Sequence, residues 1–97
     1  MKLWRCEGGQ GGRRLVLIHG LGANADVWQP MQKSVERRWL APDLRGHGRS
    51  PHQAPYGYAA YAADVASLLE QDEEIDIVGH SMGGVVGMTL ATGWYGV

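Results

Sequence analysis

The chain has 97 residues, which is enough for one domain at most. Hydrophobic residues make up 44% and charged residues 20%, as in an ordinary globular protein, and the net charge of -1 gives no electrostatic reason to expect a nucleic acid or an anionic membrane as partner. The lone Cys6 cannot form an internal disulfide bond, and neither a signal-peptide pattern nor an apolar run of membrane length is visible, so we predict a cytoplasmic protein.

The first forty residues alternate between short apolar runs and turns. Residues 2–7 predict an edge strand, and a Gly-rich turn follows it. The apolar run at residues 15–18 is short and bounded by turn residues, which is typical of a parallel strand covered on both faces. A helix is predicted next, capped by Asn24 or Asp26. Its apolar positions, at helical spacing, are Val27, Trp28, Met31 and Val35.

The remaining elements continue this alternation. A strand at residues 39–41 precedes a polar loop at 43–55, and helical spacing then runs over 57–71. The apolar face of that helix consists of Tyr58, Tyr61, Ala62, Val65, Leu68 and Leu69, with Asp64, Glu70 and Gln71 off it. A strand at 75–78 and an apolar helix at 82–92 follow. The order predicts an α/β fold, a parallel sheet with helices on both faces, in one domain.

The junction of the last strand and helix carries the sequence Gly79-His80-Ser81-Met82-Gly83, a G-x-S-x-G motif. A serine on so sharp a turn has a strained backbone, and the two glycines remove Cβ atoms that would collide there. The following helix aims free N–H groups at Ser81, which stabilises negative charge beside it. The alternative is an incidental serine in a Gly-containing turn; the strand before and the helix after favour a nucleophile.

Together with this motif, two further Gly-rich stretches indicate a resemblance to a known family. Residues 17–22 read LIHGLG, residues 43–50 read DLRGHGRS and residues 79–84 read GHSMGG. In this order and spacing, over residues 15–93, the chain resembles the N-terminal part of the α/β-hydrolase superfamily. It is most similar to the small cofactor-free esterases, enol-lactonases, C–C bond hydrolases and perhydrolases.

The resemblance implies a partial α/β-hydrolase fold with a βαβαβα core. The strand at 15–18 then lies between those at 39–41 and 75–78, and the helices after the first and third of these strands cover opposite faces. Ligands bind in such open α/β sheets where a crevice opens at the carboxyl ends of the strands. The Leu21 loop and Ser81 are both expected at that crevice.

The resemblance also implies a role for each matching residue. Ser81 attacks an acyl carbonyl and forms an acyl-enzyme, and the backbone N–H groups of Leu21 and Met82 form the oxyanion hole. The supporting residues are His19, Gly20, Gly22, Gly79, His80 and Gly83. Substrates are small-molecule carboxylic esters, lactones or thioesters, without a cofactor or metal. An Asp in place of Ser81 would have indicated the haloalkane dehalogenases or epoxide hydrolases.

Other polar residues are assigned structural roles. His19 is interpreted as a buried residue that fixes its loop, and His80 is not expected to be the base for Ser81, because adjacent residues on a tight turn point apart. His47 and His52 are predicted on the surface. Asp43 and Arg45 are predicted to brace their loop, and no cluster of His and Cys residues has metal-ligand spacing.

In this family the catalytic acid and His follow the nucleophile along the chain. No Asp, Glu or His follows Ser81 here, so we interpret residues 1–97 as the N-terminal portion of a single hydrolase domain, truncated after the nucleophile helix. Two alternatives remain: an inactive remnant that self-associates through the exposed edge of the 75–78 strand, and an acyltransferase on the same machinery. The sequence does not identify the substrate.

Overall fold

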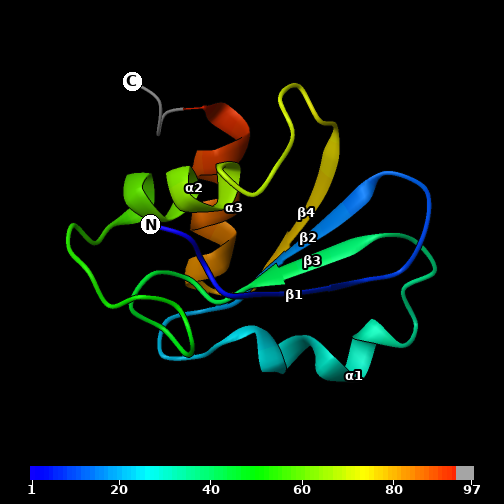
Figure 1. Ribbon diagram of the computed structural model, residues 1–97, viewed down its shortest axis with the longest axis horizontal. Coiled ribbons are helices and arrows are strands. Elements are labelled where there is room, and N and C mark those ends of the chain that lie inside the picture. Colours follow the sequence, from blue (N-terminus) through cyan, green and yellow to red (C-terminus); the bar gives the residue numbers. More distant parts are fainter. Residues whose placement is uncertain (94–97) are drawn as a thin grey trace.

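The computed structural model describes residues 1–93, in which four strands form one mixed sheet (Figure 1). The strands are β1 (Arg5–Gly8), β2 (Arg14–Ile18), β3 (Trp39–Pro42) and β4 (Ile75–Gly79), arranged in the order β1-β3-β2-β4. β2 runs parallel to both β3 and β4 and lies between them, which confirms the expected strand order. The predicted edge strand β1 lies at the edge, but it pairs with β3 antiparallel, so the sheet is not wholly parallel.

Helices cover both faces of the sheet, as predicted. The helical elements are the 3-10 helix η1 (Ala25–Trp28), α1 (Gln29–Gln32), α2 (Tyr58–Ala66) and α3 (Met82–Thr92). η1 and α1 lie on one face, and α2 and α3 pack against each other on the other face (Figure 1). The elements that follow β2 and β4 therefore lie on opposite sides. Within residues 1–93, none of the helices is long and apolar enough to cross a bilayer.

The alternation of side chains along β2 divides the core into two clusters. Leu17 packs with Trp28 and Ala41 beneath η1, whereas Val16 and Ile18 pack toward α2 and α3. These three β2 side chains are completely buried, as expected for a strand covered on both faces.

The helix predicted to carry residues 27–35 is shorter than its apolar spacing indicates. Asn24 caps it as expected, accepting a hydrogen bond from the Asp26 N–H at 2.9 Å. The helical turns of η1 and α1 are distinct and end at Gln32, before Val35. Pro30 has no N–H to donate to the Asp26 carbonyl, so a continuous α-helix cannot form across this point.

The helix predicted over residues 57–71 is also shorter, and two of its positions were wrongly assigned. α2 ends at Ala66. Tyr58, assigned to the apolar face, is exposed at the first helical position. Asp64, assigned to the polar face, is buried, because its two carboxylate oxygens each accept a hydrogen bond from the Arg45 guanidinium at 2.8 Å. An ion pair between loop and helix thus replaces solvent at a position that helical periodicity marks as polar.

Candidate active site

Ser81 occupies the turn between β4 and α3, in a conformation that costs backbone strain. Its φ is 57° and its ψ is -120°, a region that side-chain-bearing residues rarely adopt. Three backbone hydrogen bonds hold the turn: His80 N–H donates to the Ile18 carbonyl at 3.0 Å, Gly83 N–H to the His80 carbonyl at 2.9 Å, and Gly84 N–H to the Ser81 carbonyl at 2.9 Å. The side chain of Ser81 is exposed.

Two glycines of the motif are required by close backbone contacts. A Cβ atom at Gly79 would lie 2.3 Å from the Gly83 carbonyl oxygen, and one at Gly83 would lie 2.1 Å from the Ile18 carbonyl oxygen. The first contact confirms that the chain meets itself at this turn. The second shows that Gly83 also lets α3 rest directly on the end of β2, so the Ser81 turn is fixed to the central strand.

The loop after β2 places the backbone of Leu21 at the same end of the sheet. Ala23 N–H donates to the Gly20 carbonyl at 3.1 Å, closing a turn in which Gly22 has a φ of 75°. Gly20 lies against the Ser81 turn, since a Cβ atom there would be 3.1 Å from the His80 carbonyl oxygen. Within residues 1–93, the N–H groups of Leu21 and Met82 have no hydrogen-bond acceptor.

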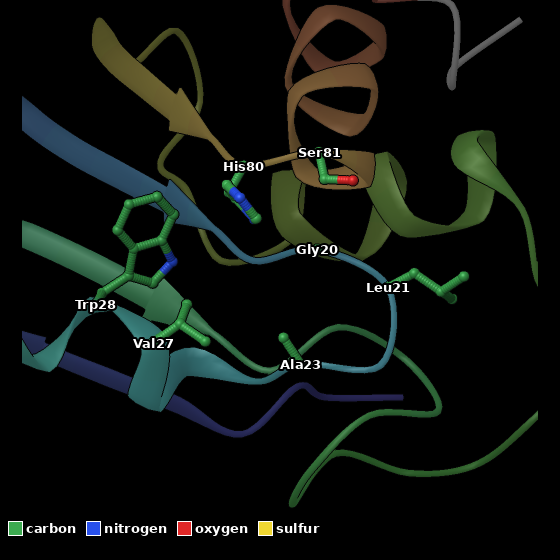
Figure 2. A pocket seen from close by; sticks show the side chains of 7 residues that line it. All are labelled: Gly20, Leu21, Ala23, Val27, Trp28, His80 and Ser81. Carbon is green, nitrogen blue, oxygen red and sulfur yellow. The ribbon is translucent and has the colours of Figure 1, made fainter.

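The two turns border one hollow of about 350 Å³ at the carboxyl ends of β2 and β4 (Figure 2). Its lining consists of Gly20, Leu21, Ala23, Val27, Trp28, His80 and Ser81, and is mostly apolar. This position confirms the expected crevice between the elements that follow the two strands. Figure 2 shows the side chains of Ser81 and His80 leaving the turn in different directions, as predicted.

His19 is buried behind the hollow and links two loops. Its Nδ1 lies 2.7 Å from the Gly20 carbonyl oxygen, and its Nε2 accepts a hydrogen bond from the Leu44 N–H at 2.9 Å. Nδ1 therefore carries the proton and donates it to Gly20, and the ring is neutral. Burial lowers the pKa of the His19 imidazole, and the hydrogen bond to Gly20 only partly opposes this. The structural role predicted for His19 fits this geometry.

His52 is exposed as predicted, whereas His47, also predicted on the surface, is only partly exposed. The His47 ring is half-buried, with its centroid 5.0 Å from that of His19, and it lies nearly perpendicular to the Tyr61 ring. Turn composition alone does not reveal that a loop folds back over a buried ring. Among the described residues, no three His, Cys, Asp or Glu side chains gather closely enough to hold a metal ion.

Asp43 braces the loop after β3, as predicted, and does not line the hollow. Its buried carboxylate accepts hydrogen bonds from the Ala25 N–H at 2.7 Å, the Arg49 N–H at 2.9 Å and the Arg49 Nε at 3.0 Å. Burial alone would raise the pKa of Asp43, but the donors from Arg49 and Ala25 hold it below its usual value. Arg45, bound to Asp64, braces the same loop against α2.

Sequence analysis did not identify Trp28 as a residue that borders the site. Its place in a helical apolar pattern marks it only as a core residue, and its side chain is indeed 9% exposed. The ring packs in the core and also forms one wall of the hollow that Ser81 borders (Figure 2). The one available indication was its place in the sequence, because Trp28 comes only a few residues after the Leu21 loop.

We expect the buried His19 to make stability depend on pH near neutrality. The ordinary pKa of 6.5 applies in the unfolded chain, and the folded value is lower. The unfolded chain therefore binds the proton first. This contribution to stability is fully present above pH 6.5 and is lost as the pH falls toward the folded pKa. The loss is about 1.4 kcal/mol for each pKa unit between the unfolded and folded values.

Urea unfolding at about pH 7 and about pH 5 measures this dependence. His19→Gln should remove most of the difference between the two conditions, and exposed His52→Gln should leave it unchanged. The same pH dependence in the His19→Gln variant would assign the effect to another group.

Comparison with known proteins agrees with this architecture. Residues 15–97 match the alpha/beta hydrolase family. Lipase LipV of Mycobacterium tuberculosis is 40% identical over 87 residues, which cover 87% of this chain and 33% of LipV. A solved marine microorganism esterase has a TM-score of 0.88 at 30% identity, covering 95% of this chain and 37% of its own. The enol-lactonase from Burkholderia xenovorans LB400 has a TM-score of 0.82 at 30% identity, and the match covers 92% of this chain and 37% of the enol-lactonase chain.

The chain thus spans 33% to 37% of the length of these three relatives. The family match extends over more than half of the chain and includes both turns that border the hollow. The fold, the strand order and the matched residues lead to one assignment: this chain belongs to the alpha/beta hydrolase family.

Proposed function

We propose that residues 1–97 form the N-terminal portion of a serine hydrolase domain that cleaves carboxylic ester, lactone or thioester bonds. The observation that carries the proposal is the position of Ser81, exposed on a strained turn at the rim of the hollow that the Leu21 loop also borders. Ser81 Oγ loses its proton to a base and bonds to the acyl carbon. The alkoxide or thiolate leaves, and water then releases the acid from the acyl-enzyme.

The backbone N–H groups of Leu21 and Met82 form the oxyanion hole in this proposal. Both are without an acceptor in the described part of the chain, and both follow residues that line the hollow, Gly20 and Ser81. Met82 is the first residue of α3, so its N–H also contributes the positive end of the helix dipole. Donors fixed by the backbone need no reorganisation when negative charge develops, and one such donor contributes about 10²–10³ in rate.

The base and its acid partner are assigned to a part of the hydrolase domain outside these residues. His19 is committed to Gly20 and Leu44, and His80 leaves the turn away from Ser81 (Figure 2). No Asp, Glu or His follows Ser81 in the sequence. Relatives named as lipase, esterase and enol-lactonase support a small-molecule ester or lactone as the substrate. A cytoplasmic location remains a prediction from the sequence.

For the isolated chain we expect slow labelling of Ser81 by a fluorophosphonate, and p-nitrophenyl acetate turnover near background. When a catalytic triad is incomplete, the oxyanion hole and substrate binding alone still accelerate the reaction about 10³–10⁴-fold over the rate in water. Ser81→Ala should abolish the labelling, and the control Ser34→Ala, at an exposed serine outside the hollow, should not. Mass spectrometry of the labelled peptide identifies the site.

Two results separate the alternatives. An unlabelled Ser81 in a folded chain, with copies associating along the free edge of β4 in sedimentation velocity, supports the inactive remnant. Rapid Ser81-dependent turnover by the isolated chain contradicts the assignment of the base to another part of the domain. Faster acyl transfer to an added alcohol than to water supports the acyltransferase.

A further inference from the structure

The indole N–H of Trp28 is a buried hydrogen-bond donor without an acceptor. Among residues 1–93, its Nε1 is the one buried side-chain nitrogen or oxygen that has no hydrogen-bond partner. An N–H group in this condition has given up its bond to water and gained nothing, so nearly all buried polar groups in folded proteins are paired. The unpaired donor in this chain lies in the wall of the hollow that Ser81 borders.

The indole ring is held in place with this donor toward the hollow. Trp28 packs against Leu17, Ala25, Trp39 and Ala41, which fix the ring. Figure 2 shows the indole nitrogen on the edge of the ring that faces the interior of the hollow, with the six-membered ring turned away from Ser81.

Nε1 is buried in the free chain, so a ligand atom reaches it only when neighbouring side chains of the lining move. The nitrogen itself has almost no exposed surface, so an acceptor must pass between the neighbouring lining residues. Val27 is 49% exposed, and His80 is also exposed. Both can change rotamer without disturbing the core. Binding then gives the indole N–H the acceptor that it lacks in the free chain.

The lining offers donors at more than one place. The N–H groups of Leu21 and Met82 belong to the two turns that border the hollow, Figure 2 shows Trp28 across the hollow from Leu21, and no carboxylate lines it. A simple alkyl ester has one carbonyl, which would occupy the backbone donors and leave Trp28 unpaired. A substrate with a second oxygen acceptor satisfies both.

We propose that the hollow selects acyl substrates that carry a second carbonyl beyond the ester or lactone carbonyl, and that the Trp28 Nε1–H donates to it. Trp28 is a positioning residue in this inference, because it touches the substrate away from the reacting carbon. The inference rests on the proposed function, since it places the first carbonyl at Ser81.

The test uses ¹⁵N-labelled chain carrying Ser81→Ala, which prevents hydrolysis, and two probes of equal chain length. Methyl 3-oxobutanoate has the second carbonyl, and methyl butanoate lacks it. The first probe should move the Trp28 indole N–H signal downfield and bind about fivefold to tenfold more tightly than the second, as expected for one hydrogen bond. Equal shifts and equal affinities for both probes would overturn the inference.

Trp28→Phe should abolish the preference, so that both probes bind equally. Trp39→Phe is the matched control: Trp39 is buried in the same core cluster but does not line the hollow, and its loss should leave the preference intact. If Trp28→Phe fails to fold, the indole signal of the Ser81→Ala chain still decides. A Ser81 that reacts with fluorophosphonate, together with an unmoved Trp28 signal, would overturn this inference and leave the proposed function standing.

Discussion

Gly83→Ala is expected to prevent stable folding of the chain. The added Cβ atom would lie 2.1 Å from the Ile18 carbonyl oxygen and 2.6 Å from that of His19. Both atoms belong to the backbone at the end of the central strand, so no side-chain rotation relieves the collision. We expect a loss of about 3 kcal/mol or more, which is a large part of the roughly 5–15 kcal/mol that stabilises a domain of this size.

The matched control is Gly84→Ala, one residue further along α3. A Cβ atom there meets nothing closer than the Gly79 carbonyl oxygen at 3.6 Å, and alanine favours a helix interior over glycine by about 1 kcal/mol. Far-UV circular dichroism during urea unfolding measures both variants. If the Gly83→Ala variant unfolded cooperatively at the same urea concentration as the Gly84→Ala variant, α3 would not rest on β2 as described.

Asp43→Ala is expected to cost about 2–4 kcal/mol, because it removes a completely buried acceptor from backbone N–H donors. The N–H groups of Ala25 and Arg49 would lose their acceptor, and the partly exposed Arg49 guanidinium would keep Asp26 on the surface and the face of the Trp4 ring. The loop after β3 and the start of η1 would separate. Urea unfolding measures the loss.

Asp26→Ala is the control for Asp43→Ala, because it removes the exposed partner of the same arginine and should cost about 1 kcal/mol or less. Acid provides a second measurement. The folded pKa of Asp43 is depressed below 3.8, so its stabilisation is present above that pH and is lost as the pH falls through the folded pKa. A chain with Asp43→Asn should lack this acid-dependent loss. Equal costs for Asp43→Ala and Asp26→Ala would contradict the account.

The strand order was predictable because it follows from the pattern and the family resemblance together. The run at residues 15–18 is apolar without alternation, which indicates a strand buried on both faces, and the structure confirms it as the middle parallel strand. The antiparallel pairing of β1 was not predicted, because the residue pattern of a four-residue strand does not show which strand it pairs with or in which direction.

Errors in the helices came from interactions that periodicity does not contain. Pro30 divides η1 from α1 by removing a single backbone donor. The burial of Asp64 depends on Arg45, a residue nineteen positions earlier whose conformation is set by its own loop. For the site, the family resemblance implied that the Leu21 loop meets the Ser81 turn. The sequence could not show that Trp28 lines the hollow, because a helical apolar pattern does not tell which buried aromatic side chain also borders a pocket.

The contact between Gly83 and the end of β2 has a consequence for how this region tolerates change. The relative positions of the Ser81 turn and the Leu21 loop are set by main-chain atoms: the Gly83 contact and the bond from His80 N–H to the Ile18 carbonyl. The Leu21 side chain, 75% exposed, and that of Val27 take no part in this alignment. Substitutions at these two positions can reshape the hollow while the alignment stays fixed, which makes them the natural sites for a library that changes the ligand.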